Sequence, residues 1–162
     1  MARGDILLVS EGRDWAARLI VAVTRNPVHH AAIDRGDGTA VSAETTGVCI
    51  KPISDFAKVQ AVSIGTREQR EQAAWFAEGL VKQPYNKAAF ILAGLSSLGL
   101  VPGFLEQALA DLVEGRGYIC SSLVDTCYLA AGVDILPGPS AFTWPGELVQ
   151  LTGPAAVNVA TA

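Results

Sequence analysis

The segment from residue 120 to residue 132 constrains the fold more than any other part of the chain. Its apolar residues recur at the spacing of one helical face, and Gly132 follows as a stop signal. That face consists of Cys120, Leu123, Val124, Cys127, Tyr128 and Ala131. Because such a stripe must pack onto a hydrophobic core, the spacing predicts a helix that begins at Cys120, directly after the glycine-rich turn 115–119.

Cys120 would occupy the first turn of this helix, and two interpretations follow from that position. The unpaired backbone N–H groups and the positive end of the helix dipole favour a thiolate over a thiol, and the same N–H groups can bind an oxyanion. A small core residue is the alternative, since free cysteine is among the most buried residue types. Without a base nearby, the core residue is the favoured interpretation.

The two histidines of the chain are the neighbours His29 and His30. They begin a segment, 28–44, that is typical of two short strands joined at residues 35–38, since Asp-Gly is a strong hairpin signal. Adjacent strand residues point to opposite faces, so this pair is not expected to bind one metal ion, and at most one histidine should face a helix packed on the sheet. A structural imidazole and a base for Cys120 both remain open.

Several short segments follow one another in a characteristic order. They are Gly4–Leu8, His30–Ile33 with the turn Gly36–Gly38 and Glu44, then Gly47-Val48, Pro84-Tyr85 and Cys120–Val124. In these residues the chain resembles the NlpC-type papain-like amidases. The cysteine helix precedes the histidine in ordinary members but follows it here, so the chain is similar to the circularly permuted, YiiX-like branch, which is related to lecithin retinol acyltransferase. The similarity runs from about residue 4 to residue 150.

The resemblance implies an α+β fold of the permuted papain-like type. A small antiparallel sheet or barrel would pack against helices, with the nucleophile at a helix N-terminus. Carried over by position, it implies Cys120 as nucleophile, His30 as general base and Glu44 as the residue that orients the imidazole. Two positions depart from the branch, which often has a glutamate in place of Ser122 and a serine in place of His29, so the charge of the pocket is expected to differ.

The remaining site residues would bind substrate. Tyr85 is similar to the tyrosine that lies beside the nucleophile in the family, and the amides of Cys120 and Ser121 would stabilise the oxyanion of a tetrahedral intermediate. Glu44 would accept the second ring N–H of His30. The alternative for Glu44 is a solvent-facing strand residue, because a slip of one residue in the hairpin would turn it to the opposite face.

These residues predict a thiol hydrolase or acyltransferase that cleaves an amide or an ester through a cysteine acyl-enzyme. The substrate would be a small molecule, a cell-wall peptide or a lipid acyl group, and neither a cofactor nor a metal is expected. The alternative is a non-catalytic binding or structural module on the same fold, for example in a phage particle. The residues leave the oligomeric state open.

Composition supports one domain, over residues 1–154. With 162 residues and 50% hydrophobic content, the chain can form a core without metals or disulfides, and its three cysteines fit a reducing compartment. Cys49 is expected to be a buried strand residue. The tail 155–162 lacks periodicity and is expected to fray. A net charge of −4 with no basic cluster argues against a nucleic-acid partner.

Two segments bear on localisation. The first residues hold no apolar stretch of the kind that precedes a cleavage site, so no secretion signal is expected, and the protein would work inside the cell or leave it by a route that the sequence does not indicate. Residues 88–105 contain no charge but are interrupted by Gly94, Gly99, Pro102 and Gly103. Packed core and a peripheral contact with a membrane or an acyl chain are the two interpretations, and a true span is disfavoured.

Overall fold

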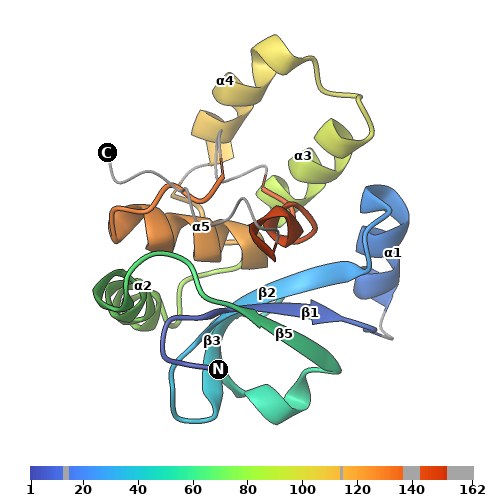
Figure 1. The fold of residues 1–162 in the computed structure, drawn as a ribbon. Coiled ribbons are helices and arrows are strands. Elements are labelled where there is room, and N and C mark those ends of the chain that lie inside the picture. The colour runs from blue at the N-terminus through green and yellow to red at the C-terminus, as the bar shows by residue number, and fades with distance from the viewer. Residues whose placement is uncertain (13–14, 114, 137–142, 153–162) are drawn as a thin grey trace.

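The computed structural model describes residues 1–12, 15–113, 115–136 and 143–152. The protein is α+β, with a five-stranded antiparallel sheet packed against helices (Figure 1). In spatial order the strands are β4 (Gly47–Pro52), β3 (Thr39–Glu44), β2 (Val28–Asp34), β1 (Ile6–Ser10) and β5 (Lys58–Val62). The described helices are α1 (Trp15–Thr24), α2 (Arg67–Gly79), α3 (Lys87–Ser97), α4 (Gly103–Val113) and α5 (Cys120–Ala130), with short 3₁₀ helices at Ile53–Asp55 and Glu147–Thr152. The predicted tail 155–162 lies outside the described residues.

The main core lies between the sheet and helix α5, as the stripe in the sequence predicts. Leu123, Val124 and Tyr128 have no exposed surface, and they cluster with the inward side chains of β1 and β2. The Tyr128 hydroxyl also donates a hydrogen bond of 2.6 Å to the Gly4 carbonyl, which ties α5 to the start of the chain. The helix stops at Gly132, whose positive φ of 76° suits a residue without a side chain.

Helix α2 and the second face of the sheet complete the packing. Ala73, Ala74 and Ala77 of α2 are fully buried, because small side chains allow this helix to approach α5 and the sheet closely. Thr66 and Gln69 form the capping box at its start. On the other face, Leu7, Ala32 and Ala40 are covered by Ile53, Phe56 and Val59. The central strands β1, β2 and β3 are therefore buried on both faces, which explains their continuous apolar runs.

The predicted hairpin is confirmed as β2–β3. Its register pairs Ala32 with Ser42 and Asp34 with Ala40, around a turn in which Gly36 and Gly38 have positive φ values of 81° and 84°. The Asp34 carboxylate accepts a hydrogen bond of 2.7 Å from the Gly36 N–H. If the register continues for two more residues, His30 lies level with Glu44.

The pairing of β1 with β2 contains an irregularity beside this point. Val9 pairs with His30, but the next residue, Ser10, pairs with Val28. His29 is therefore an extra residue in β2, which is the pattern of a β-bulge. A bulge breaks the strict alternation of side chains between the two faces of a strand, so the rule that separates adjacent residues does not hold for His29 and His30.

Residues 88–105 do not form a single element. They make up most of α3, a connection and the start of α4, and Gly99 has a positive φ of 71° just after the end of α3. Helix α3 packs on α1 and α4. Helix α5 lies between the α3–α4 pair and the sheet, whereas α1 contacts β2 directly (Figure 1). Among the described residues, no helix is long and apolar enough to cross a membrane.

Candidate active site

Cys120 is the first residue of α5, and a short pairing of two loops determines what lies beside it. Tyr118 donates its N–H to the Pro84 carbonyl at 3.0 Å, and Asn86 donates its N–H to the Tyr118 carbonyl at 3.1 Å. Gly117 permits this approach, because a Cβ there would lie 2.0 Å from the Pro84 oxygen. The pairing brings Tyr85 to the segment that leads into α5.

A cavity of about 450 Å³ is lined by Cys120, His30, Glu44 and Tyr85. These four residues are far apart in the sequence and come from α5, the β2–β3 hairpin and the loop before α3. Val9, Ala17, Ile20 and Phe90 add apolar walls, and Lys51 and Asp55 add charge. The cavity is therefore polar on the side of the hairpin and apolar on the side of α1 and α3.

His30 is connected to Glu44 through Ser42, a residue that the sequence did not single out. The Nε2 atom of His30 lies 2.7 Å from the Ser42 Oγ, which donates to the Glu44 Oε1 at 2.8 Å. The Nε2 to Oε1 distance is 3.6 Å, so the direct hydrogen bond expected between His30 and Glu44 is absent in this state. The hydroxyl proton of Ser42 is directed at the carboxylate, so its oxygen accepts from Nε2–H, and Nδ1 of a neutral imidazole is then the basic nitrogen.

The position of Ser42 in the strand accounts for this bridge. Ser42 and Glu44 are two residues apart in β3 and share a face, while His30 lies diagonally across on β2. The serine side chain is fully buried, and a buried hydroxyl needs a hydrogen-bond partner. A polar residue within an otherwise apolar, buried strand is the signal that would have identified it.

The Glu44 carboxylate remains ionised in this arrangement. Burial raises its pKa, but the nearby His30, the Ser42 hydroxyl and the Lys51 ammonium outweigh that effect, so the pKa of Glu44 is lowered overall. Lys51 Nζ lies 3.3 Å from the Glu44 Oε1 and stands 5.0 Å from the centre of the Phe56 ring. A charged carboxylate two hydrogen bonds from the His30 ring favours an imidazolium when a proton is delivered to it.

Burial of the Cys120 thiol opposes the thiolate that a helix start favours. This burial raises the pKa of the thiol to about 11. The N–H groups of Ala31, Ser121 and Cys120 itself lower the pKa, and the Glu44 charge raises it again. Only 6% of the residue is exposed, and desolvation of the thiolate outweighs the backbone contribution.

Tyr85 and Ser121 were both expected to bind substrate, and they are placed differently. Tyr85 lines the cavity, and its pKa is raised by burial, by the proximity of Cys120 and by Glu44, so its hydroxyl keeps its proton. The Ser121 side chain is fully buried and donates its hydroxyl to the Thr143 carbonyl. The part of Ser121 that acts on the Cys120 thiol is its main-chain N–H.

His29 also lines the cavity, so both histidines border it. The bulge disturbs the alternation of side chains between these neighbours, while the His30 ring packs against Phe56 on the face of the sheet away from α5. His29 is 8% exposed, and its Nδ1 has no hydrogen-bond partner among the described residues. Gly12 leaves room for the imidazole, since a Cβ there would lie 2.4 Å from the His29 Nε2.

The other cysteines lie elsewhere. Cys127 is buried in the core face of α5, and burial raises its pKa to about 12. Cys49 is half-buried rather than buried as expected, because β4 is an edge strand whose later residues are exposed in alternation. Within the described ranges, no group of three or more histidine, cysteine, aspartate or glutamate residues could hold a metal ion.

Comparison with models of known protein families finds no match to this chain, and no curated protein matches its sequence.

Proposed function

We propose that this protein is a thiol hydrolase or acyltransferase that cleaves an amide or an ester through a cysteine acyl-enzyme. The observation that carries the proposal is the convergence of Cys120 and His30 on one cavity, with the His30 ring bonded to Ser42 and through it to Glu44. The resemblance to the permuted, YiiX-like branch of the NlpC-type papain-like amidases supports the same assignment, and with it a permuted papain-like fold.

The reaction begins with a neutral thiol. As the Cys120 sulfur attacks the acyl carbon, the thiol proton passes to the Nδ1 of His30, and the imidazolium is stabilised by Glu44 through Ser42. The N–H groups beside the sulfur, those of Cys120 and Ser121, donate to the oxyanion. Collapse of the intermediate breaks the bond to the leaving amine or alcohol, which takes the proton from His30 and leaves a thioester on Cys120.

The second half of the reaction uses the same groups. Water or an acceptor hydroxyl or amine attacks the thioester while His30 removes its proton, and the acid or the new ester or amide leaves. The cavity combines charged residues near Cys120 with apolar walls from α1 and α3, which suits a substrate with a polar reacting centre and an apolar extension. A cell-wall peptide and a lipid acyl group both meet this description.

A non-catalytic binding or structural module is the second candidate. The observation that favours it is the pKa of about 11 for the Cys120 thiol, which is that of a buried rather than an activated cysteine. On this account the cavity would bind a ligand, and the buried Ser42 and Glu44 would serve only to hold the hairpin.

Acylation of the intact protein by activated esters distinguishes the two candidates. We expect p-nitrophenyl acetate and p-nitrophenyl octanoate to give a transient acyl adduct that peptide mass spectrometry maps to Cys120, with catalytic release of p-nitrophenol. Cys120→Ser should abolish both, whereas Cys49→Ser should retain them. An adduct that forms on Cys49 as readily as on Cys120, without turnover, would favour the binding module.

A further inference from the structure

The outer faces of α1, α3 and α4 expose a large apolar surface, here called the hairpin surface. It consists of Leu19, Val21, Ile91, Leu95, Leu98, Leu100, Phe104, Leu105 and Leu112. Most of the large apolar side chains exposed in the described chain belong to it, and Phe104 reaches 83% exposure. Helix α3 contacts both α1 and α4, so these exposed side chains lie on neighbouring elements, and large apolar patches on soluble monomers usually mark an interaction site.

These side chains are exposed even though the inner faces of α3 and α4 are packed against the rest of the protein. The opposite faces of α3 and α4 are packed, with Ala89, Ala93, Ala110 and Val113 buried. Helix α3 is therefore apolar on its packed side and again on its solvent side. A helix that is apolar all round is normally enclosed by protein or by lipid.

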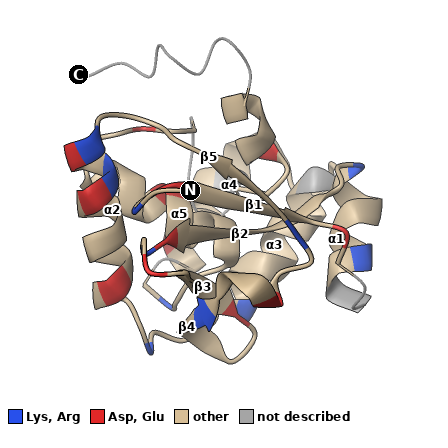
Figure 2. Ribbon diagram, turned by 60° about the horizontal axis from the view of Figure 1, so that its bottom comes forward, with Lys and Arg blue, Asp and Glu red and all other residues tan. Residues whose placement is uncertain are grey.

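The charges around the hairpin surface favour lipid as the partner. No charged residue occurs from 88 to 105, and the helices α1 and α3 contain no acidic residue. Arg18 in α1, Arg25 just after it and Lys87 at the start of α3 are exposed. The sequence of α4 contains the acidic Glu106 and Asp111 and no basic residue. Charged residues gather instead on α2, as Figure 2 shows. On the side of α1 and the start of α3, the apolar side chains are bordered by basic residues, which is complementary to the headgroup region of an anionic bilayer.

The shape of the surface agrees with this partner. Helices α3 and α4 form a hairpin that projects from the body on the side away from the sheet, and its most exposed side chains, Leu100 and Phe104, lie at and just after the connection (Figure 1). A projecting apolar tip can enter the headgroup layer, whereas a second copy of the chain would require a broad matching face. We propose that the hairpin surface docks this protein peripherally onto anionic lipid bilayers.

The docking surface and the cavity share two helices. Phe90 of α3 and Ile20 of α1 line the cavity, while their neighbours Ile91 and Leu19 belong to the hairpin surface. Docking would therefore place the bilayer against the helices that form the apolar wall of the cavity. The proposal does not rest on catalysis, because binding to a bilayer does not require Cys120.

Cosedimentation of the full chain with vesicles tests the proposal. We expect binding to phosphatidylcholine vesicles that strengthens when phosphatidylglycerol is included and weakens with added salt. The double variant Leu100→Ser/Phe104→Ser should bind at least about tenfold more weakly, because two large apolar side chains no longer enter the bilayer. Cys120→Ala should bind as the wild type does, which keeps this test separate from that of the proposed function.

A matched control uses exposed apolar residues on other helices. Trp75 on α2 and Leu129 on α5 are 65% and 56% exposed, and Trp75→Ser/Leu129→Ser should leave vesicle binding unchanged. Circular dichroism of both double variants checks that they fold. Absence of vesicle binding by the folded wild type, or equal loss in the control, overturns the proposal. A concentration-dependent dimer that the Leu100/Phe104 variant cannot form also overturns it, in favour of a second copy.

Discussion

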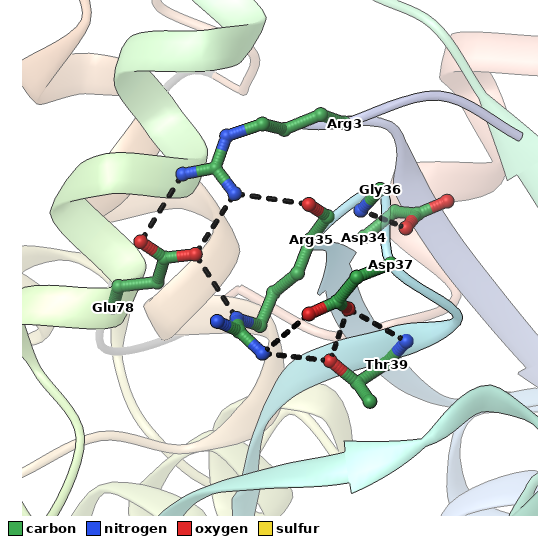
Figure 3. A network of polar contacts seen from close by, with 7 residues as sticks. All are labelled: Arg3, Asp34, Arg35, Gly36, Asp37, Thr39 and Glu78. Carbon is green, nitrogen blue, oxygen red and sulfur yellow. Dashed lines mark hydrogen bonds and ion pairs between the residues drawn. The ribbon is translucent and has the colours of Figure 1, made fainter.

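The hairpin β2–β3 carries a polar cluster at each end, and the two clusters differ in what their hydrogen bonds serve. At the turn, Glu78 of α2 accepts from Arg3 at 2.9 Å and from Arg35 at 3.0 Å, and Arg35 also bonds to Asp37 and Thr39 (Figure 3). At the open end, Glu44 binds Ser42, which binds His30 beside a cavity.

The turn cluster is the more heavily charged of the two, yet its contacts are those of a cluster that stabilises the fold. Its cations and carboxylates are paired with one another, and they join the start of the chain, the hairpin and α2. The pKa of Glu78 is lowered, chiefly by its hydrogen bond to Arg3. The number of charges therefore does not distinguish the proposed reactive end of the hairpin. That end is distinguished by a cavity that both Cys120 and His30 line.

The largest expected effect is a difference in ester turnover between substitutions at the two ends of the β2–β3 hairpin. His30→Ala should lower turnover of an activated ester by about 10²–10⁴-fold, because it removes the general base. Arg35→Gln at the turn should remain within about twofold of the wild type, and His29→Ala should retain much more activity than His30→Ala. Initial rates of p-nitrophenol release measure all three, and a large loss in Arg35→Gln would contradict the division.

The rate at which Cys120 is alkylated should depend on pH, and this dependence tests the proposed site at the open end of the hairpin. With a thiol pKa of about 11, the thiolate fraction rises about tenfold per pH unit below that value. Alkylation of Cys120 by iodoacetamide should therefore accelerate by about a hundredfold between about pH 7 and pH 9, as followed by peptide mass spectrometry. A rate that is already level near neutral pH would indicate a preformed thiolate–imidazolium pair instead of a neutral thiol.

The sequence predicted the elements of the site better than its contacts. The helical stripe from Cys120 and the Asp37-Gly38 turn are local patterns, and both were confirmed. The bulge at His29 depends on how β1 pairs with β2, which no local pattern records. The raised pKa of Cys120 arises from packing by distant residues, and the role of Ser42 depends on a gap of 3.6 Å between His30 and Glu44.

Removal of the Ser42 hydroxyl should have an intermediate effect. Ser42→Ala breaks the bridge and leaves the Nε2 of His30 too far from Glu44 for a direct hydrogen bond, so we expect about a tenfold loss of ester turnover with the fold retained. Ser63 offers a matched control, because its hydroxyl donates to the Asp5 carboxylate at 2.6 Å outside the cavity. Ser63→Ala should keep its activity, and a similar loss in both variants would mean that the effect is not specific to the bridge.

The smallest expected effect belongs to the turn. The folded-state pKa of Glu78 lies below its unfolded value, so its contribution to stability is present above the unfolded pKa, near 4.5, and is lost as the pH falls through the folded pKa. The pairs are partly exposed, and Glu78→Gln should cost about 0.5–1 kcal/mol in the free energy of unfolding at neutral pH. Urea denaturation measures this loss, which should shrink in high salt and toward low pH. Ester turnover by the folded variant should be unchanged, because the turn cluster lies at the opposite end of the hairpin from the residues that bridge His30 to Glu44. If turnover fell together with stability, the two ends would be coupled along β2 and β3, and the turn would be part of the reactive site.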